Sequence, residues 1–238
     1  MTNKKVNIDK LAEQFWEDGY LVLPEFFPLP QMAYCQNVVS EHFGDKPSFV
    51  HDSAFIEQSK TEVIPWFPQR EGDTTFNETE ANSTFNALTN AILGEQWQPQ
   101  YCMVMYSSPD SKGQAWHQDC PPEAPAHFNL NRLVYTMDIT DETGGEVYIR
   151  PGTHKNSVLT AGELFEDFSD QVVVRPKQGT LILLHGHCWH RVGRSGGKAR
   201  ISTNFRAVPA GVSDDITDIC VYRNMRYQFS TQQVISTQ

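Results

Sequence analysis

The sequence predicts a mainly β protein of the α+β kind, in which helices precede a β-rich core of the sandwich, jelly-roll or barrel type. Two observations predict this class. Apolar residues recur at helical spacing within the first hundred residues. From about residue 100, short strand-like runs alternate with Gly, Pro and Asp turns, and no strand–helix–strand unit is apparent.

The N-terminal segment predicts a helix followed by a strand. Asn7 or Asp9 caps the helix, which ends at Gly19 because glycine tolerates the left-handed conformation of a helix C-terminus. Residues 20–23 are apolar and form a short strand that Pro24 stops.

Two further helices are predicted before the β-rich part. Pro30 opens the first of them, and its buried side is expected to carry Met32, Ala33, Val39 and Phe43. The other spans residues 84–93 and ends at Gly94. Residues 46–83 are polar and irregular, and a loop of this length inside a compact domain is functional or disordered. We expect this segment to act as a lid over the site.

The β-rich part contains six strand-like runs, at residues 101–106, 133–139, 146–149, 171–175, 180–185 and 200–208. The chain has no internal repeat and no low-complexity linker, so we expect one domain over residues 1–238. Within it, residues 1–99 would supply helical and lid elaborations, residues 100–208 the β core and residues 209–238 a C-terminal extension.

Composition excludes several classes of partner. The 238 residues include 19 Lys+Arg and 29 Asp+Glu, which gives a net charge of −10. Nucleic acids and anionic membranes attract cationic surfaces, so we expect neither as a partner. The polar N-terminus lacks the apolar segment of a signal peptide, and the five cysteines form no Cys-x-x-Cys pair. These features predict a cytoplasmic protein, and the sequence does not predict its oligomeric state.

One His-x-Asp pattern, at His117 and Asp119, carries possible chemistry. On a strand these two side chains share a face, because the alternation repeats every two residues. Imidazole and carboxylate are two of the three ligands of the facial triad that holds non-haem Fe(II). Taken alone, the pattern is also typical of a surface ion pair.

Three histidines further along the chain can supply a third ligand: His185, His187 and His190. On a regular strand, His185 and His187 lie on one face and His190 lies on the other. The three therefore cannot surround one metal ion without a break in the strand. Each of them is also compatible with a hydrogen-bonded core residue.

The last predicted core strand has one unusually polar face. Its polar face carries Arg200, Ser202, Asn204 and Arg206, and its other face carries Ile201, Thr203, Phe205 and Ala207. Such a face suggests a strand that lines a cavity. Arg200 and Ser202 can bind one carboxylate, through a bidentate charge-assisted pair and a hydroxyl hydrogen bond.

With these residues in place, the chain resembles the phytanoyl-CoA dioxygenase-like family of Fe(II)/2-oxoglutarate-dependent oxygenases. Four segments carry the resemblance in order and spacing: residues 15–23, the Gln-x-x-His-x-Asp pattern of residues 114–119, the loop of residues 144–154, and residues 179–190 with Arg200 ten positions beyond. The similarity covers residues 8–24 and 100–208.

The resemblance implies a double-stranded β-helix, a cupin-like jelly-roll core, with N-terminal and flanking helices. It implies Fe(II) as cofactor, with 2-oxoglutarate and O₂ as cosubstrates. It assigns His117, Asp119 and His190 to iron, and Arg200, Ser202 and Gln114 to 2-oxoglutarate.

The implied reaction is hydroxylation of a small-molecule substrate with release of succinate and CO₂. Halogenating relatives lack the carboxylate that Asp119 supplies, so hydroxylation or desaturation is the expected outcome. Candidate substrate contacts are Tyr101, Met103, Trp116, Gln118, His187, Trp189 and Arg206.

Three residues depart from the family pattern: Thr143, Thr180 and Glu146. The first two change only turn residues. Glu146 would place a carboxylate near the wall of the cosubstrate pocket.

Two other functions stay open from the sequence. A cupin-like dioxygenase or isomerase would bind its metal through His185, His187 and His190, which gives Asp119 and Arg200 no task. A non-catalytic binding module on the same fold would be expected to lack part of the triad or of the carboxylate site.

Overall fold

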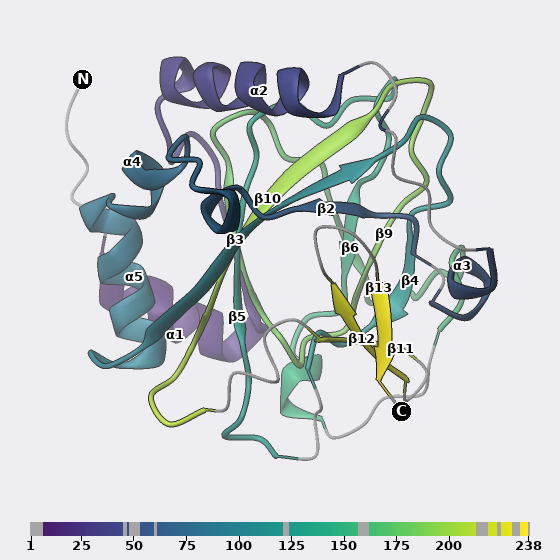
Figure 1. The fold of residues 1–238 in the computed structure, drawn as a ribbon. Coiled ribbons are helices and arrows are strands. Elements are labelled where there is room, and N and C mark those ends of the chain that lie inside the picture. The colour runs from purple at the N-terminus through teal and green to yellow at the C-terminus, as the bar shows by residue number, and fades with distance from the viewer. Residues whose placement is uncertain are drawn as a thin grey trace.

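The computed structural model describes residues 7–44, 47, 53–59, 61–120, 124–156, 162–212, 219–222, 225–229 and 234–237. Within them, two antiparallel sheets form the core; most helices lie at the top and left in Figure 1, and one short helix lies at the right. The described part of the chain contains no helix that is both long and apolar enough to cross a membrane.

The larger sheet has six antiparallel strands. In spatial order they are β1 (Tyr20–Leu23), β8 (Leu181–His185), β5 (Leu130–Val134), β10 (Arg200–Val208), β3 (Gln98–Ser107) and β2 (Ile64–Trp66). The smaller sheet contains β4 (Gln114–His117), β9 (His190–Val192), β6 (Val147–Ile149) and β7 (Val172–Val174). Side chains from both sheets line one pocket, so the predicted jelly-roll arrangement is confirmed.

The predicted helices are confirmed nearly to the residue. They are α1 (Ile8–Asp18), α2 (Leu29–Phe43) and α5 (Ser83–Leu93). The Asn7 side chain caps α1 by accepting a hydrogen bond from the Lys10 backbone N–H at 3.1 Å, and Gly19 ends this helix in the left-handed conformation. On α2, however, Ala33 is exposed and Cys35 takes its expected place on the buried side.

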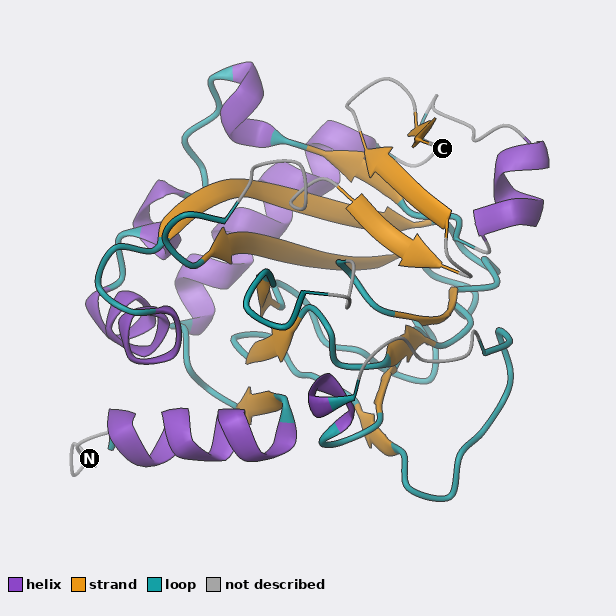
Figure 2. Ribbon diagram, turned by 90° about the horizontal axis from the view of Figure 1, so that it is seen from below, coloured by secondary structure: helices purple, strands orange, loops and turns teal. Residues whose placement is uncertain are grey.

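Alternation along the strands of the large sheet separates a helix-facing side from a pocket-facing side. On β10, Ile201 and Phe205 pack into a hydrophobic core with residues of α1, α2 and α5, such as Phe15 and Phe85. Figure 2 shows these helices against the large sheet. The other face of β10 lines the pocket, as the polar alternation predicted.

The prediction of an irregular segment over residues 46–83 is wrong for much of its length. Its described part contains α3 (Ser53–Ser59), β2, η1 (Pro68–Glu71) and α4 (Asn77–Glu80). Strand β2 pairs with β3, and both Trp66 and Phe76 are buried in the core. Three of these elements, β2, η1 and α4, have only three or four residues and are too short to show a period in the sequence, which explains why they were not predicted. Residues 45–46, 48–52 and 60 lie outside the described residues.

Other short strands also escaped prediction. Strands β4 and β9 have four and three residues, and the strand expected over residues 133–139 runs instead over Leu130–Val134. The predicted C-terminal extension contains a small antiparallel sheet of β11 (Ile219–Tyr222), β12 (Met225–Phe229) and β13 (Val234–Thr237). In this extension, residues 213–218, 223–224, 230–233 and 238 lie outside the described residues.

Candidate metal and cosubstrate site

Two strands of the small sheet bring together the predicted metal ligands. His117 ends β4 and pairs in register with His190, the first residue of β9. Asp119 follows β4 directly, and its backbone N–H donates to the Gly186 carbonyl at 2.7 Å. One ligand atom from each of His117, Asp119 and His190 lies within 4.8 Å of the other two. This is the spacing that a single metal ion requires.

Backbone hydrogen bonds orient both imidazoles toward this point. His117 Nδ1 lies 2.7 Å from the Ala115 carbonyl, and His190 Nδ1 lies 2.9 Å from the Cys188 carbonyl. A carbonyl can only accept, so each Nδ1 carries the proton and donates. The lone pair of each ring is therefore on Nε2, and these Nε2 atoms lie 3.4 Å and 3.5 Å from the Asp119 carboxylate oxygens. Metal-binding histidines are held in this way.

The protonation states also suit a metal. Burial lowers the pKa of His190 to about 4, with a further contribution from His117, so this imidazole is neutral at neutral pH. Burial alone would raise the pKa of Asp119, but His190 and the Arg206 guanidinium hold the pKa of that carboxyl well below its usual range. Two neutral imidazoles and one carboxylate form the donor set of a non-haem iron site.

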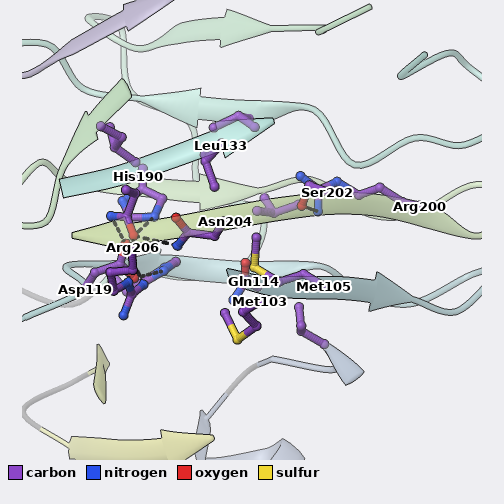
Figure 3. A pocket seen from close by; sticks show the side chains of 16 residues that line it. Met103, Met105, Gln114, Asp119, Leu133, His190, Arg200, Ser202, Asn204 and Arg206 are labelled. Atoms are coloured by element: carbon purple, nitrogen blue, oxygen red, sulfur yellow. Dashed lines mark hydrogen bonds and ion pairs between the residues drawn. The ribbon is translucent and has the colours of Figure 1, made fainter. Parts of the chain in front are cut away.

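The pocket next to these three residues continues along β10. Figure 3 shows Arg200 and Ser202 at one end of this strand, Asp119, His190 and Arg206 at the other, and Asn204 between them. The pocket is lined by polar side chains of β10 on one side and by apolar side chains of both sheets around them. Its apolar walls come from both sheets: Val63, Met103, Met105, Leu133, Val147, Leu184 and Val192.

Arg200 is a buried cation whose described partners are all neutral oxygens. Its Nε donates to the Gly145 carbonyl at 2.8 Å, its Nη1 to Ser202 Oγ at 3.0 Å and its Nη2 to the Tyr135 hydroxyl at 3.3 Å. Among the described residues, no carboxylate is paired with it. Gly145 has φ +74°, and a Cβ there would collide with the Arg200 side chain, so the glycine makes room for the guanidinium. A buried cation in a pocket favours an anionic ligand.

The family model for phytanoyl-CoA dioxygenase (PhyH) matches residues 15–202, which include His117, Asp119, His190, Arg200 and Ser202. The chain belongs to the phytanoyl-CoA dioxygenase family. The resemblance that the motifs predicted is thereby confirmed.

A curated relative of this family member is an ectoine dioxygenase from Sphingopyxis alaskensis. The two are 23% identical over 163 residues, which cover 66% of this chain and 53% of the relative. The chain thus spans about half the length of the curated relative that it matches.

Solved structures share the fold of this family member. The non-haem α-ketoglutarate-dependent epimerase SnoN of nogalamycin biosynthesis is 18% identical, with a TM-score of 0.66 over 91% of this chain and 83% of its own. HygX from Streptomyces hygroscopicus, solved with nickel and 2-oxoglutarate bound, is 16% identical, with a TM-score of 0.68 over 85% of this chain and 88% of its own. These similarities confirm the predicted double-stranded β-helix.

The structure brings the six residues predicted for metal and cosubstrate into one pocket. Gln114 lines it from β4, where it pairs in register with Val192. Glu146 does not join them, and the expectation of a carboxylate at the cosubstrate wall is corrected. Its side chain forms an ion pair with Arg175 at 2.9 Å, while the next residue, Val147, faces the pocket. Alternation on β6 places these two side chains on opposite faces.

Of the predicted substrate contacts, Met103 and Arg206 line the pocket. Tyr101 lies behind Arg206, whose guanidinium carbon is 5.6 Å from the centre of the tyrosine ring. Arg206 Nη2 also lies 3.6 Å from Asp119 Oδ2, so Arg206 forms an ion pair with a predicted metal ligand.

Four other predicted substrate contacts lie outside the described lining of the pocket. Trp116 and Trp189 pack against each other, with ring centres 5.4 Å apart. Gln118 donates to the His187 carbonyl at 2.8 Å, and the His187 ring faces Phe128. These side chains have the core-packing role that large aromatic residues commonly have.

The three-histidine alternative is not supported by the geometry. Strand β8 ends at His185, and the turn that follows carries His190 into the small sheet beside His117. His185 remains on the helix-facing side, stacked on Phe128 with ring centres 4.1 Å apart, and its ring centre lies 5.1 Å from that of His187. Among the described residues, the single cluster spaced for a metal ion contains His190 but neither of the other two.

Sequence reasoning missed two residues that contact the site. Asn131 on β5 donates to Asp119 Oδ2 at 2.6 Å, and the Tyr135 hydroxyl contacts Arg200. Asn131 lies next to Arg132 in a strand whose other residues are apolar, and a buried amide at such a position was the available signal. Tyr135 gave no such signal, because a tyrosine in a strand is ordinary.

Proposed function

We propose that this protein is an Fe(II)- and 2-oxoglutarate-dependent dioxygenase that hydroxylates a small molecule and releases succinate and CO₂. The observation that carries the proposal is the position of Arg200. A buried guanidinium with neutral partners lies in the same pocket as a cluster of two histidines and one aspartate. One dicarboxylate that chelates the metal and reaches the guanidinium would satisfy both ends.

The donor set fits the proposed metal. His117, Asp119 and His190 would hold Fe(II) through two Nε2 atoms and a carboxylate oxygen, and such a facial set leaves coordination positions open. When bound, the iron supplies the oxidative chemistry by which 2-oxoglutarate is decarboxylated and a substrate C–H bond is oxidised. The task of the three protein ligands is to fix the metal at the end of the pocket.

The remaining residues would bind and orient the cosubstrate. Arg200 and Ser202 would bind its distal carboxylate, with the Tyr135 hydroxyl as a further donor, and Gln114 would contact the end near the metal. The apolar walls exclude water from this space, which strengthens the charge pairing. A carboxylate ligand at Asp119 supports hydroxylation or desaturation as the outcome.

A small-molecule substrate is supported by the relatives. The curated relative is an ectoine dioxygenase, and HygX has been solved with hygromycin B bound. Met103, Arg206 and the neighbouring Tyr101 remain proposed substrate contacts. The net charge of −10 supports neither nucleic acid nor an anionic membrane as a partner, and we propose a cytoplasmic location.

The lid proposal is now confined to the part of residues 46–83 that lies outside the core. Helix α3 forms part of a groove with Glu62, Lys112 and Leu164, next to the pocket residues Val63 and Gln114. We expect cleavage within this segment by a protease to slow when 2-oxoglutarate and metal are bound. Equal cleavage rates with and without them would contradict a lid.

The proposed reaction is tested by following succinate. Protein supplied with Fe(II), ascorbate, 2-oxoglutarate and O₂ should form succinate, slowly alone and faster with a true substrate. His117→Ala should abolish the reaction and His187→Gln should preserve it, because only His117 lies in the proposed metal cluster. Retained activity in His117→Ala would support the three-histidine alternative. Absence of succinate from wild-type protein that binds iron, with or without candidate substrates, would support a non-catalytic module.

A further inference from the structure

A polar network lies directly behind Asp119 inside the otherwise apolar core. It consists of Asn131 on β5 and of Asn204 and Arg206 on β10, all three at most 5% exposed. Each of them also lines the pocket. Burying two amides and a guanidinium costs free energy unless their hydrogen bonds are satisfied. We therefore expect this network to have a function.

The network has a fixed direction that begins at the backbone. The Arg132 backbone N–H lies 3.2 Å from Asn204 Oδ1 and can only donate, which turns the Asn204 amide nitrogen toward Asn131. Asn204 Nδ2 then donates to Asn131 Oδ1 at 2.8 Å, and Arg206 Nε donates to the same oxygen at 3.0 Å. With its oxygen held by two donors, Asn131 must present its own amide N–H groups on the other side.

The Asn131 amide nitrogen donates mainly to the proposed metal ligand, with a longer contact of 3.5 Å to Asn129 Oδ1. Asn131 Nδ2 lies 2.6 Å from Asp119 Oδ2, and Arg206 Nη2 lies 3.6 Å from the same oxygen. Figure 3 shows Arg206 and Asn204 beside Asp119 at this end of the pocket. A donor and a positive charge therefore converge on a single carboxylate oxygen, which fixes the plane of the carboxylate and favours its ionised form.

We propose that Asn131 and Arg206, supported by Asn204, are positioning residues that hold the Asp119 carboxylate in the orientation that binds the metal. This inference rests on the proposed function, because it takes Asp119 as a metal ligand. It also gives Arg206 a different main task from the substrate contact that the sequence predicted. Arg206 directs both Nε and Nη2 into the network, and hydrogen-bond partners of metal ligands contribute about 10–100-fold to metal affinity.

Four variants separate the roles of shape, charge and hydrogen bonding. Asn131→Leu keeps the volume and removes the donor, whereas Asn131→Asp places a carboxylate against Oδ2. Arg206→Met removes the charge, whereas Arg206→Lys keeps it. Thr203→Val is the matched control, because Thr203 is a buried residue of the same strand on the opposite face, with a hydroxyl that has no described hydrogen-bond partner.

The primary measurement is titration of the metal-free proteins with Co(II) alone, followed by its visible absorption, with thermal melts alongside. We expect Asn131→Leu and Arg206→Met to bind Co(II) about 10–100-fold more weakly and to change the Co(II) spectrum. Arg206→Lys should recover part of the affinity, Asn131→Asp should be weakest of the four, and Thr203→Val should match wild type. If a variant fails to fold, the more conservative change at the same position decides the result.

Two results would overturn the proposal, and a third concerns a different claim. Wild-type Co(II) affinity and spectrum in both Asn131→Leu and Arg206→Met would remove the positioning role. Unchanged Co(II) binding with a raised KM for substrate in Arg206→Met would make Arg206 a substrate contact instead. Wild-type Co(II) binding by Asp119→Ala would show that the proposed metal site itself is wrong, which is a separate failure of the proposed function.

Discussion

The protein contains two clusters of buried histidines, His117 with His190 and His185 with His187, which differ in the hydrogen-bond partners of their rings. His117 and His190 lie in the small sheet beside Asp119, with their ring centres 4.2 Å apart. His185 and His187 lie on the helix-facing side among aromatic rings such as Phe128. Both clusters are buried, so burial does not distinguish them.

The backbone distinguishes them by setting the position of the ring protons. In the first cluster, both Nδ1 atoms donate to carbonyls, which leaves Nε2 lone pairs directed at a carboxylate and a pocket. In the second, the His187 backbone N–H donates to His185 Nδ1 at 3.1 Å, so that lone pair is already used. The number of histidines close together therefore does not identify a metal site. The hydrogen-bond partners of their rings identify it better.

The largest expected effect comes from breaking the first cluster while keeping the second. Asp119→Ala should lower Co(II) affinity and succinate formation by more than about 100-fold, beyond what loss of a partner of a ligand costs. His187→Gln should leave both within about twofold, because His187 lies outside the described cluster that is spaced for a metal ion. Metal titration and a succinate assay measure the two variants side by side. Equal losses in both would erase the distinction between the clusters.

The next effect concerns the cosubstrate end of the first cluster's pocket. Arg200→Met should weaken 2-oxoglutarate binding about 10- to 100-fold, since a charged hydrogen bond contributes about 1.5–3 kcal/mol. Co(II) affinity should stay within about twofold, because Arg200 lies at the other end of β10. Calorimetric titration of 2-oxoglutarate into the Co(II)-loaded protein measures this, with Arg200→Lys expected to be intermediate. Unchanged 2-oxoglutarate affinity in Arg200→Met would remove Arg200 from the site.

A third prediction uses the pH response of the second cluster. Burial lowers the pKa of His185 to about 2, with His187 and His154 adding to the effect. In the unfolded chain this imidazole has a pKa near 6.5, so below that pH the unfolded state binds a proton that the folded state does not. Stability of the metal-free protein should fall by up to about 1.4 kcal/mol per pH unit from this residue as the pH drops from 6.5.

Urea unfolding of the metal-free protein between pH 7 and pH 4 tests this slope. His185→Gln should reduce it by about one proton. A full slope in His185→Gln would show that His185 does not remain neutral when buried.

The smallest effect is expected at the hydroxyl beside Arg200. Ser202→Ala removes one neutral hydrogen bond, worth about 0.5–1.5 kcal/mol, so 2-oxoglutarate should bind about 2- to 10-fold more weakly. Thr203→Val, on the opposite face of the same strand, should have no effect. The same calorimetric titration compares the two variants. A larger loss of 2-oxoglutarate affinity in Thr203→Val than in Ser202→Ala would contradict the assignment of Ser202 to the pocket-facing side of β10.

Much of the fold could be read from local signals. The Asn7 cap, the Gly19 stop and the polar alternation of β10 each depend on a few adjacent residues, and all three are confirmed. Strands β2, β4 and β9 were missed because three or four residues show no period and their pairing is non-local.

In the site, too, local patterns were predictable and non-local contacts were not. His117 and Asp119 are neighbours in the sequence, so their shared face was predictable. Asn131 reaches Asp119 only because β5 and β4 belong to different sheets that meet at the pocket, and nothing local records that contact. Glu146 was expected near the cosubstrate, and its ion pair with Arg175 is a non-local contact that no local pattern records.

The central claim is that His117, Asp119 and His190 hold the metal and that Arg200 binds the far end of 2-oxoglutarate. A crystal structure of the protein grown with Mn(II) and 2-oxoglutarate under anaerobic conditions tests it most directly. The account predicts metal density bonded to both Nε2 atoms and to Asp119, with the distal carboxylate on Arg200 and Ser202. Metal on His185 and His187, or 2-oxoglutarate away from Arg200, would contradict it.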